Sequence, residues 1–148
     1  MNSFFARLYL DLKERIKSEV PMIQNIEQDF RQYKLENWQL NVSFPTLLID
    51  FPNTKYSQES GLSQLGEVKI KFKLLNYLFD QNNEDTLADQ KVTLELFEIE
   101  DQLIKALQGW KGNYFQPLIR LSSSTKKRKG LKFQIRKLVF NTIYEEEF

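Results

Sequence analysis

The segment of residues 67–79, EVKIKFKLLNYLF, constrains the fold more than any other part of the sequence. Its apolar residues alternate with lysines, as in a strand that buries one face. After Leu74 the alternation changes phase, because Leu75, Tyr77 and Phe79 then hold the apolar positions. We expect a β-bulge near Leu74 and Leu75 that returns the apolar side chains to one face and bends the strand.

The alternation changes phase in the same way within residues 131–144, LKFQIRKLVFNTIY. Together with residues 113–124, this segment predicts two further strands joined through TKKRKG, where Gly130 tolerates a positive φ. Two strands that bend in this manner indicate a strongly curved sheet.

Two other segments have the periodicity of amphipathic helices. The first covers residues 3–20, with Ser3 as N-cap and Pro21 as the stop. The second covers residues 86–108 and ends at Gly109, which suits a left-handed cap. We expect their apolar stripes to share one core with the bent strands, formed by Leu12, Ile16, Ile70, Phe72, Leu96, Leu103, Leu138 and Phe140.

The remaining segments predict short elements and loops. Residues 47–49 are a short apolar run between two prolines and predict a buried strand. Residues 22–30 fit a short strand or a helical turn, of which we favour the strand, and a polar loop follows. Residues 53–66 are rich in turn formers and predict an exposed loop.

These elements predict a single α+β domain over residues 1–148. Its sheet is expected to be curved, mainly antiparallel, built from four to five strands, and packed against two long helices.

The composition narrows the classes of function. The 148 residues include no cysteine and no histidine, which excludes disulfides, cysteine zinc sites and Ser-His or Cys-His nucleophile systems. Glu98 and Asp101 share a helix face with no clustered partner. We therefore predict no enzymatic activity, catalytic residue, cofactor or metal. No apolar run approaches the roughly 18 residues of a membrane span, so no membrane partner is expected.

Three charged clusters are candidate contact sites. The basic run either is a solvated hairpin tip or contacts DNA phosphates. The lysine face either is solvated and protects a sheet edge, or forms a charged subunit or lumen surface. The acidic segment either is solvated or complements the lysine face in a head-to-tail contact. The basic run is Lys126, Lys127, Arg128 and Lys129, the lysine face is Lys69, Lys71 and Lys73, and the acidic segment is Glu145, Glu146 and Glu147.

Nearly the whole chain resembles the tail-terminator, or tail-completion, proteins of tailed phages and prophages. The resemblance follows the order of an N-terminal helix, the proline-led FPTLLIDF, SQLGEVKIKFKL, a helix ending in FEIEDQLIKALQG, and the closing pair NYFQPLIRL and GLKFQIRKLVFNTIYEE. As fold positions it supports Pro45, Leu47, Ile49, Arg120 and Thr142.

The resemblance implies a non-enzymatic virion protein that assembles into a homohexameric ring. Such a ring caps the tail tube and forms the surface for head-tail joining. The implied partners are further copies of the chain, tube and head-connector proteins, and DNA contacted without sequence specificity in the lumen. The implied location is the host cytoplasm during assembly and then the virion tail. The alternative is a small accessory domain, monomeric or dimeric, that binds a protein partner through the lysine face.

Overall fold

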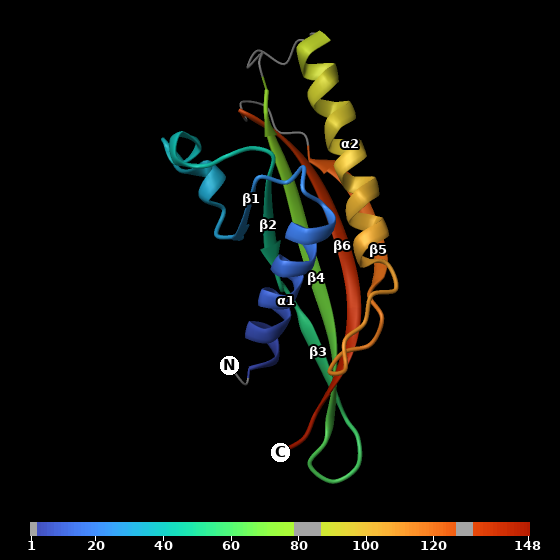
Figure 1. Cartoon of the computed structure of the whole chain (residues 1–148). Helices are drawn as coiled ribbons and strands as arrows, with labels where there is room; N and C mark the ends of the chain where they lie inside the picture. Colours follow the sequence, from blue (N-terminus) through green and yellow to red (C-terminus); the bar gives the residue numbers. More distant parts are fainter. Residues whose placement is uncertain (1–2, 79–86, 127–131) are drawn as a thin grey trace.

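The computed structural model describes residues 3–78, 87–126 and 132–148. Two helices cover one face of a six-stranded sheet, in which the strand order is β1-β2-β4-β6-β5 and β3 pairs with β4 beyond β2 (Figure 1). The elements are α1 (Phe4–Glu19), β1 (Asn25–Gln28), η1 (Gln32–Lys34), η2 (Trp38–Asn41), β2 (Thr46–Asp50), β3 (Thr54–Gln58), β4 (Gln64–Tyr77), α2 (Leu87–Leu107), β5 (Ile119–Lys126) and β6 (Phe133–Glu146).

The α+β class and the two helices agree with the sequence, but the expected sheet of four to five strands was wrong. The sheet has six strands and is mixed, because β1 runs parallel to β2. The additional strand is β3, which lies in the expected loop of residues 53–66. Its side chains are mostly exposed, so it lacks apolar alternation, and its backbone pairing with β4 holds it in place.

The expected bulge near Leu74 and Leu75 was also wrong. Strands β4 and β6 pair without interruption from Gln64↔Glu146 to Tyr77↔Phe133. The phase of the apolar residues changes because the second face of the sheet is buried at that end. A separate cluster forms there, with Tyr33, Leu48, Leu75, Phe133 and Ile135 at its centre. The shift in register lies in β5 instead, between Arg120 and Ser122.

The core on the helical face confirms the expected packing. Both apolar stripes meet the inward residues of β4 and β6, and Phe72 and Phe140 form an edge-to-face aromatic pair. All eight residues named for this core are at most 1% exposed: Leu12, Ile16, Ile70, Phe72, Leu96, Leu103, Leu138 and Phe140.

The predicted helix ends are confirmed as well. The Ser3 hydroxyl accepts a hydrogen bond from the amide of Ala6, and Gly109 has a φ of 78° after the end of α2. The helices contact each other where Arg15 Nε donates to the carbonyl of Ala106 at 2.7 Å. That bond satisfies a carbonyl in the last turn of α2 with a cationic donor. Among the described residues, no helix is both long and apolar enough to cross a membrane.

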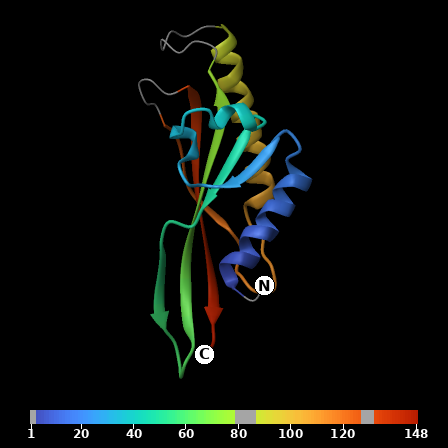
Figure 2. The same ribbon diagram turned by 90° about the vertical axis from the view of Figure 1, so that its left-hand side faces the viewer.

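The β3–β4 hairpin and the end of β6 extend beyond the helices as an arm (Figure 2). At the base of this arm the ring of Tyr144 stacks on Phe4 with 3.6 Å between centroids. The Tyr144 hydroxyl lies 2.9 Å from that of Tyr56. Gly66 is the residue paired with Tyr144, and a Cβ there would lie 2.4 Å from the tyrosine ring. A side chain at position 66 would therefore collide with the ring that anchors the arm.

Candidate functional site

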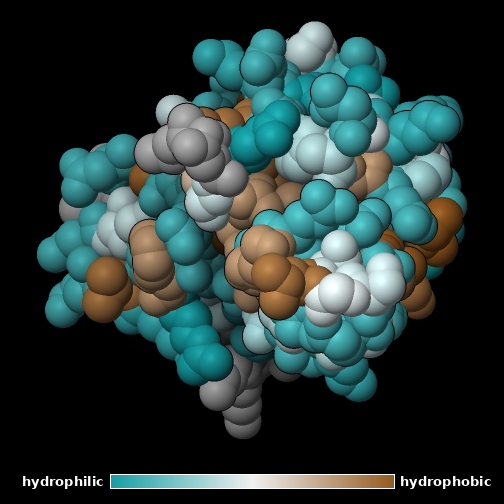
Figure 3. Space-filling view, turned by 90° about the horizontal axis from the view of Figure 1, so that it is seen from below, coloured by the Kyte–Doolittle hydropathy of each residue, from teal (hydrophilic) through white to brown (hydrophobic). Residues whose placement is uncertain are grey.

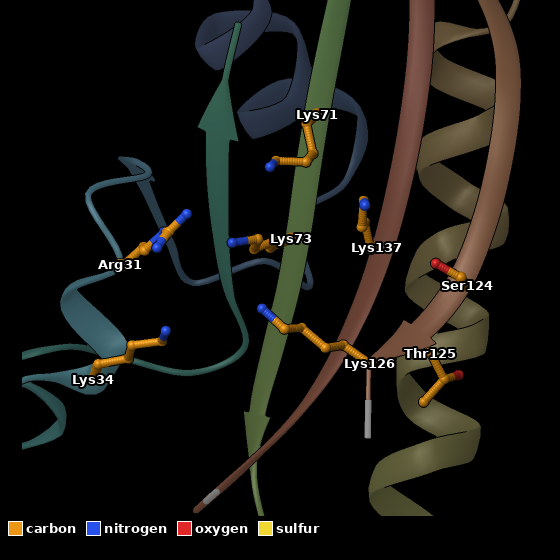
Figure 4. A pocket seen from close by; sticks show the side chains of 8 residues that line it. All are labelled: Arg31, Lys34, Lys71, Lys73, Ser124, Thr125, Lys126 and Lys137. Carbon is orange, nitrogen blue, oxygen red and sulfur yellow. The ribbon is translucent and has the colours of Figure 1, made fainter. Parts of the chain in front are cut away.

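A cleft of about 500 Å³ opens on the sheet face away from the helices. Figure 4 shows side chains from β4, β5 and β6 on one side of it and the segment around η1 on the other. Six of the eight lining residues are cationic, so we name it the basic cleft. It is lined by Arg31, Lys34, Lys71, Lys73, Ser124, Thr125, Lys126 and Lys137.

The register of the sheet brings these cations together. Lys73 on β4 is paired directly with Lys137 on β6, and Lys137 with Ser124 on β5. Like charges directly opposite each other destabilise a sheet unless anions compensate them. Lys73 has such a partner in Asp29, whereas Lys137 has no ion-pair partner among the described residues. The cleft therefore has capacity for an external anion.

A tight turn after β1 builds the opposite wall. The amide of Asp29 donates to the carbonyl of Ile49, and the Asp29 side chain accepts from the amide of Arg31, each at 2.9 Å. Arg31 has a left-handed backbone with a φ of 59°. The next turn, η1, then places Tyr33 over β4, where its ring is only 4% exposed.

The phenol of Tyr33 joins two of the ammonium groups. It accepts hydrogen bonds from Lys73 Nζ at 3.1 Å and from Lys126 Nζ at 3.3 Å. Burial alone would raise the pKa of Tyr33, but these two bonds outweigh it and lower the pKa. Burial alone would lower the pKa of Lys73, but its bonds to Tyr33 and Asp29 raise it. Lys73 therefore stays charged at neutral pH, and the two hydrogen bonds to Tyr33 hold both ammonium groups in position.

Residues from two predicted clusters meet in this cleft. Lys71 and Lys73 of the lysine face line it, but Lys69 does not. Lys126 of the basic run lines it too. The rest of that run, Lys127, Arg128 and Lys129, lies outside the described residues.

No sequence pattern indicated Arg31, Lys34 or Lys137 as site residues. Arg31 and Lys34 lie in an expected loop, and no periodicity connects that loop to the sheet. Lys137 could in principle have been identified, because it lies on the same face of its strand as Ile135. Ile135 is buried in the cluster around Tyr33.

The acidic segment lies at the opposite end of the same two strands. Glu145 is paired with Leu65 and Glu146 with Gln64, near the start of β4. Eight positions separate Glu145 from Lys137 along β6, or about 27 Å at the usual rise per residue. Glu145 and Glu147 are exposed, while Glu146 accepts a hydrogen bond from the Tyr144 hydroxyl at 3.1 Å.

Of the two carboxylates on one face of α2, Asp101 lies 2.8 Å from the ammonium group of Lys105. The neighbouring Glu100 forms an ion pair with Arg136 of β6. The residues that the structure describes contain no group of three or more acidic side chains positioned for a metal ion.

Four of the five fold positions supported by the resemblance are buried. Leu47 and Ile49 lie in the helical-face core, and Thr142 donates from its hydroxyl to the carbonyl of Gln116 at 2.6 Å. Pro45 is buried and follows a cis peptide bond. Arg120 has an exposed side chain at the irregularity in β5, so it is not a core residue.

Apolar side chains are also exposed on the surface. Seen from the end that carries the arm, they form separate patches within a mostly hydrophilic surface (Figure 3). Phe30 and Leu35 are 73% and 64% exposed, and in the sequence they adjoin Arg31 and Lys34 of the cleft wall. The edge strand β5 exposes Ile119 and Leu121.

Comparison with known proteins does not assign a family to this chain. No protein-family model matches it, and no curated protein sequence does. Among solved structures, it is similar to a chain of the virion of a native gene transfer agent particle, with a TM-score of 0.47 and 10% identity. That alignment covers 91% of this chain and 84% of the other.

Proposed function

We propose that this chain is a non-enzymatic structural protein of a phage or prophage particle and acts as a tail terminator. In this proposal residues 1–148 are one domain, and several copies form a closed ring that caps the tail tube and meets the head connector. The ring assembles in the host cytoplasm and remains in the virion tail. The resemblance in the order of sequence elements supports this family, and the charge distribution supports assembly.

The separation of charge along β4 and β6 is the observation that carries the proposal. The basic cleft lies at one end of this strand pair and the acidic segment at the other. A closed ring needs heterologous contacts, in which two different patches of each subunit meet. Opposite charges at two distant sites supply such patches, because they attract between copies and cannot meet within one copy.

The accessory-domain alternative has weaker support. It needs all three lysines of the lysine face for a partner, yet Lys73 is buried against Asp29 and Tyr33. Lys69 and Lys71 are more accessible than Lys73, but the ammonium group of Lys71 lies 4.0 Å from the carboxylate of Asp50.

Deletion of the gene from a strain that produces the particle tests the proposed function. Electron microscopy should show tails of uncontrolled length and heads without tails, and a plasmid-borne copy should restore joined particles of uniform length. Joined particles with normal tails in the deletion strain would rule out the terminator function.

A further inference from the structure

We propose that the basic cleft of one copy of this chain binds the acidic segment of a second copy. This inference rests on the proposed ring, and it names the two surfaces that form each joint. The second copy contributes Glu145 and Glu147 as ligands, so the site is incomplete in a single chain.

The acidic segment cannot enter the cleft of its own chain. It begins within β6, whose pairing with β4 continues to Glu146. This pairing holds Glu145 about 27 Å from Lys137, at the rise of an antiparallel strand. Only the segment of another copy can therefore reach Lys137 and Lys71.

The charges of the two surfaces are complementary. Six cations line the cleft, of which Lys71 is paired with Asp50 and Lys73 with Asp29, while Lys137 has no ion-pair partner among the described residues. Glu145 and Glu147 are exposed and offer four carboxylate oxygens to Lys71, Lys137 and their neighbours. Ammonium-to-carboxylate hydrogen bonds are stronger than neutral ones, and Tyr33 already holds two of the ammonium groups in position.

The apolar neighbours of both surfaces favour a protein segment over DNA. Phe148 follows the acidic segment and is 71% exposed. Phe30 and Leu35 are exposed beside the two cationic residues of the cleft wall. A segment with carboxylates followed by a phenylalanine matches both features, whereas the phosphates of duplex DNA match the cations alone.

Zero-length cross-linking of the wild-type chain tests the contact directly. Equal amounts of ¹⁴N- and ¹⁵N-labelled protein are mixed at high concentration and treated with a carbodiimide, which joins carboxylates to amines in contact. Mass spectrometry should find mixed-isotope peptides that link Glu145 or Glu147 to Lys71, Lys126 or Lys137. Absence of such peptides, or links from the acidic segment only to other lysines, would overturn the proposal.

Charge reversal provides a second test with a built-in rescue. Lys71→Glu with Lys137→Glu in one chain, or Glu145→Lys with Glu147→Lys in another, should each weaken self-association about tenfold. A mixture of the two variants should recover association, because each supplies the charge that the other needs. Lys13→Glu with Lys17→Glu on the exposed face of α1 is the matched control and should leave association unchanged.

The outcomes separate this inference from the proposed function. If the cleft variant self-associates normally but loses affinity for a duplex DNA probe, the cleft binds DNA and this inference is wrong. If both charge-reversed variants still give joined particles with normal tails, the joint lies elsewhere while the terminator function stands. Circular dichroism and thermal melting of each variant establish that it is folded.

Discussion

The carboxylate of Asp29 lies 3.0 Å from the ammonium group of Lys73, and both side chains are almost fully buried. Removal of one partner leaves the other as an unpaired buried charge. We expect Asp29→Asn to reduce the free energy of unfolding by about 3 to 5 kcal/mol, as is typical of broken buried pairs. Urea denaturation followed by circular dichroism measures this loss.

The double variant Asp29→Leu, Lys73→Met is the control. It removes both charges and their desolvation penalty, so it should be more stable than Asp29→Asn alone. If the double variant is instead less stable than Asp29→Asn, the ion pair stabilises the protein by more than the burial of its two charges costs.

The buried second face of the sheet predicts a cost for truncating Ile135. This residue is 0% exposed although neither α1 nor α2 covers its face of the sheet. Ile135→Ala should destabilise the protein by about 2 to 5 kcal/mol. Leu121→Ala, at a position that is 52% exposed, should change stability by less than about 0.5 kcal/mol. Equal effects of the two changes in chemical denaturation would contradict the two-sided packing.

The sequence predicted the helices and the helical-face core well, because both depend on local periodicity. Ser3, Gly109 and the apolar stripes each act within a few residues of their own positions. The same reasoning failed where a pattern had two explanations. A phase change at Leu74 and Leu75 fits a bulge, and it also fits a strand that buries opposite faces in succession. The uninterrupted pairing of β4 with β6 and the buried cluster around Tyr33 distinguish these explanations.

The candidate site was harder to predict, because its residues meet through tertiary structure. Lys73 and Lys126 belong to separate predicted clusters, and Tyr33 joins them across the cleft. Strand β3 was missed for a related reason. Its backbone pairing with β4 stabilises it, and its mostly exposed side chains lack the apolar alternation that would indicate a strand.

Gly66 is predicted to be intolerant of any side chain. A Cβ at this position would lie 2.4 Å from a ring carbon of Tyr144, which is itself stacked on Phe4. Gly66→Ala should cost about 1 to 3 kcal/mol, the usual range for overpacking. Thermal denaturation of the variant measures it.

Tyr144, the other residue in this collision, provides the control. In a Tyr144→Ala background the ring is absent, so adding Gly66→Ala should cost much less than it does in the wild type. Additive effects of the two substitutions would exclude the collision as the cause.

The protein should lose stability as the pH rises above 10.0, the ordinary pKa of tyrosine. Burial, followed by hydrogen bonds to Asp11 for Tyr114 and to Tyr56 and Glu146 for Tyr144, raises the pKa of both phenols. The folded state therefore keeps these two protons after the unfolded state has lost them. Their contribution is fully present below pH 10.0 and is lost as the pH rises toward the folded-state values.

Urea denaturation at a series of alkaline pH values tests this sign, with phenolate absorbance recorded in parallel. Two of the six tyrosines should ionise only as the protein unfolds. The variant Tyr114→Phe, Tyr144→Phe cannot ionise at these positions, so its stability should fall less steeply above pH 10.0 than that of the wild type. The comparison concerns slopes, because the variant also loses hydrogen bonds at every pH. Parallel stability curves for variant and wild type would show that neither phenol resists ionisation in the folded protein.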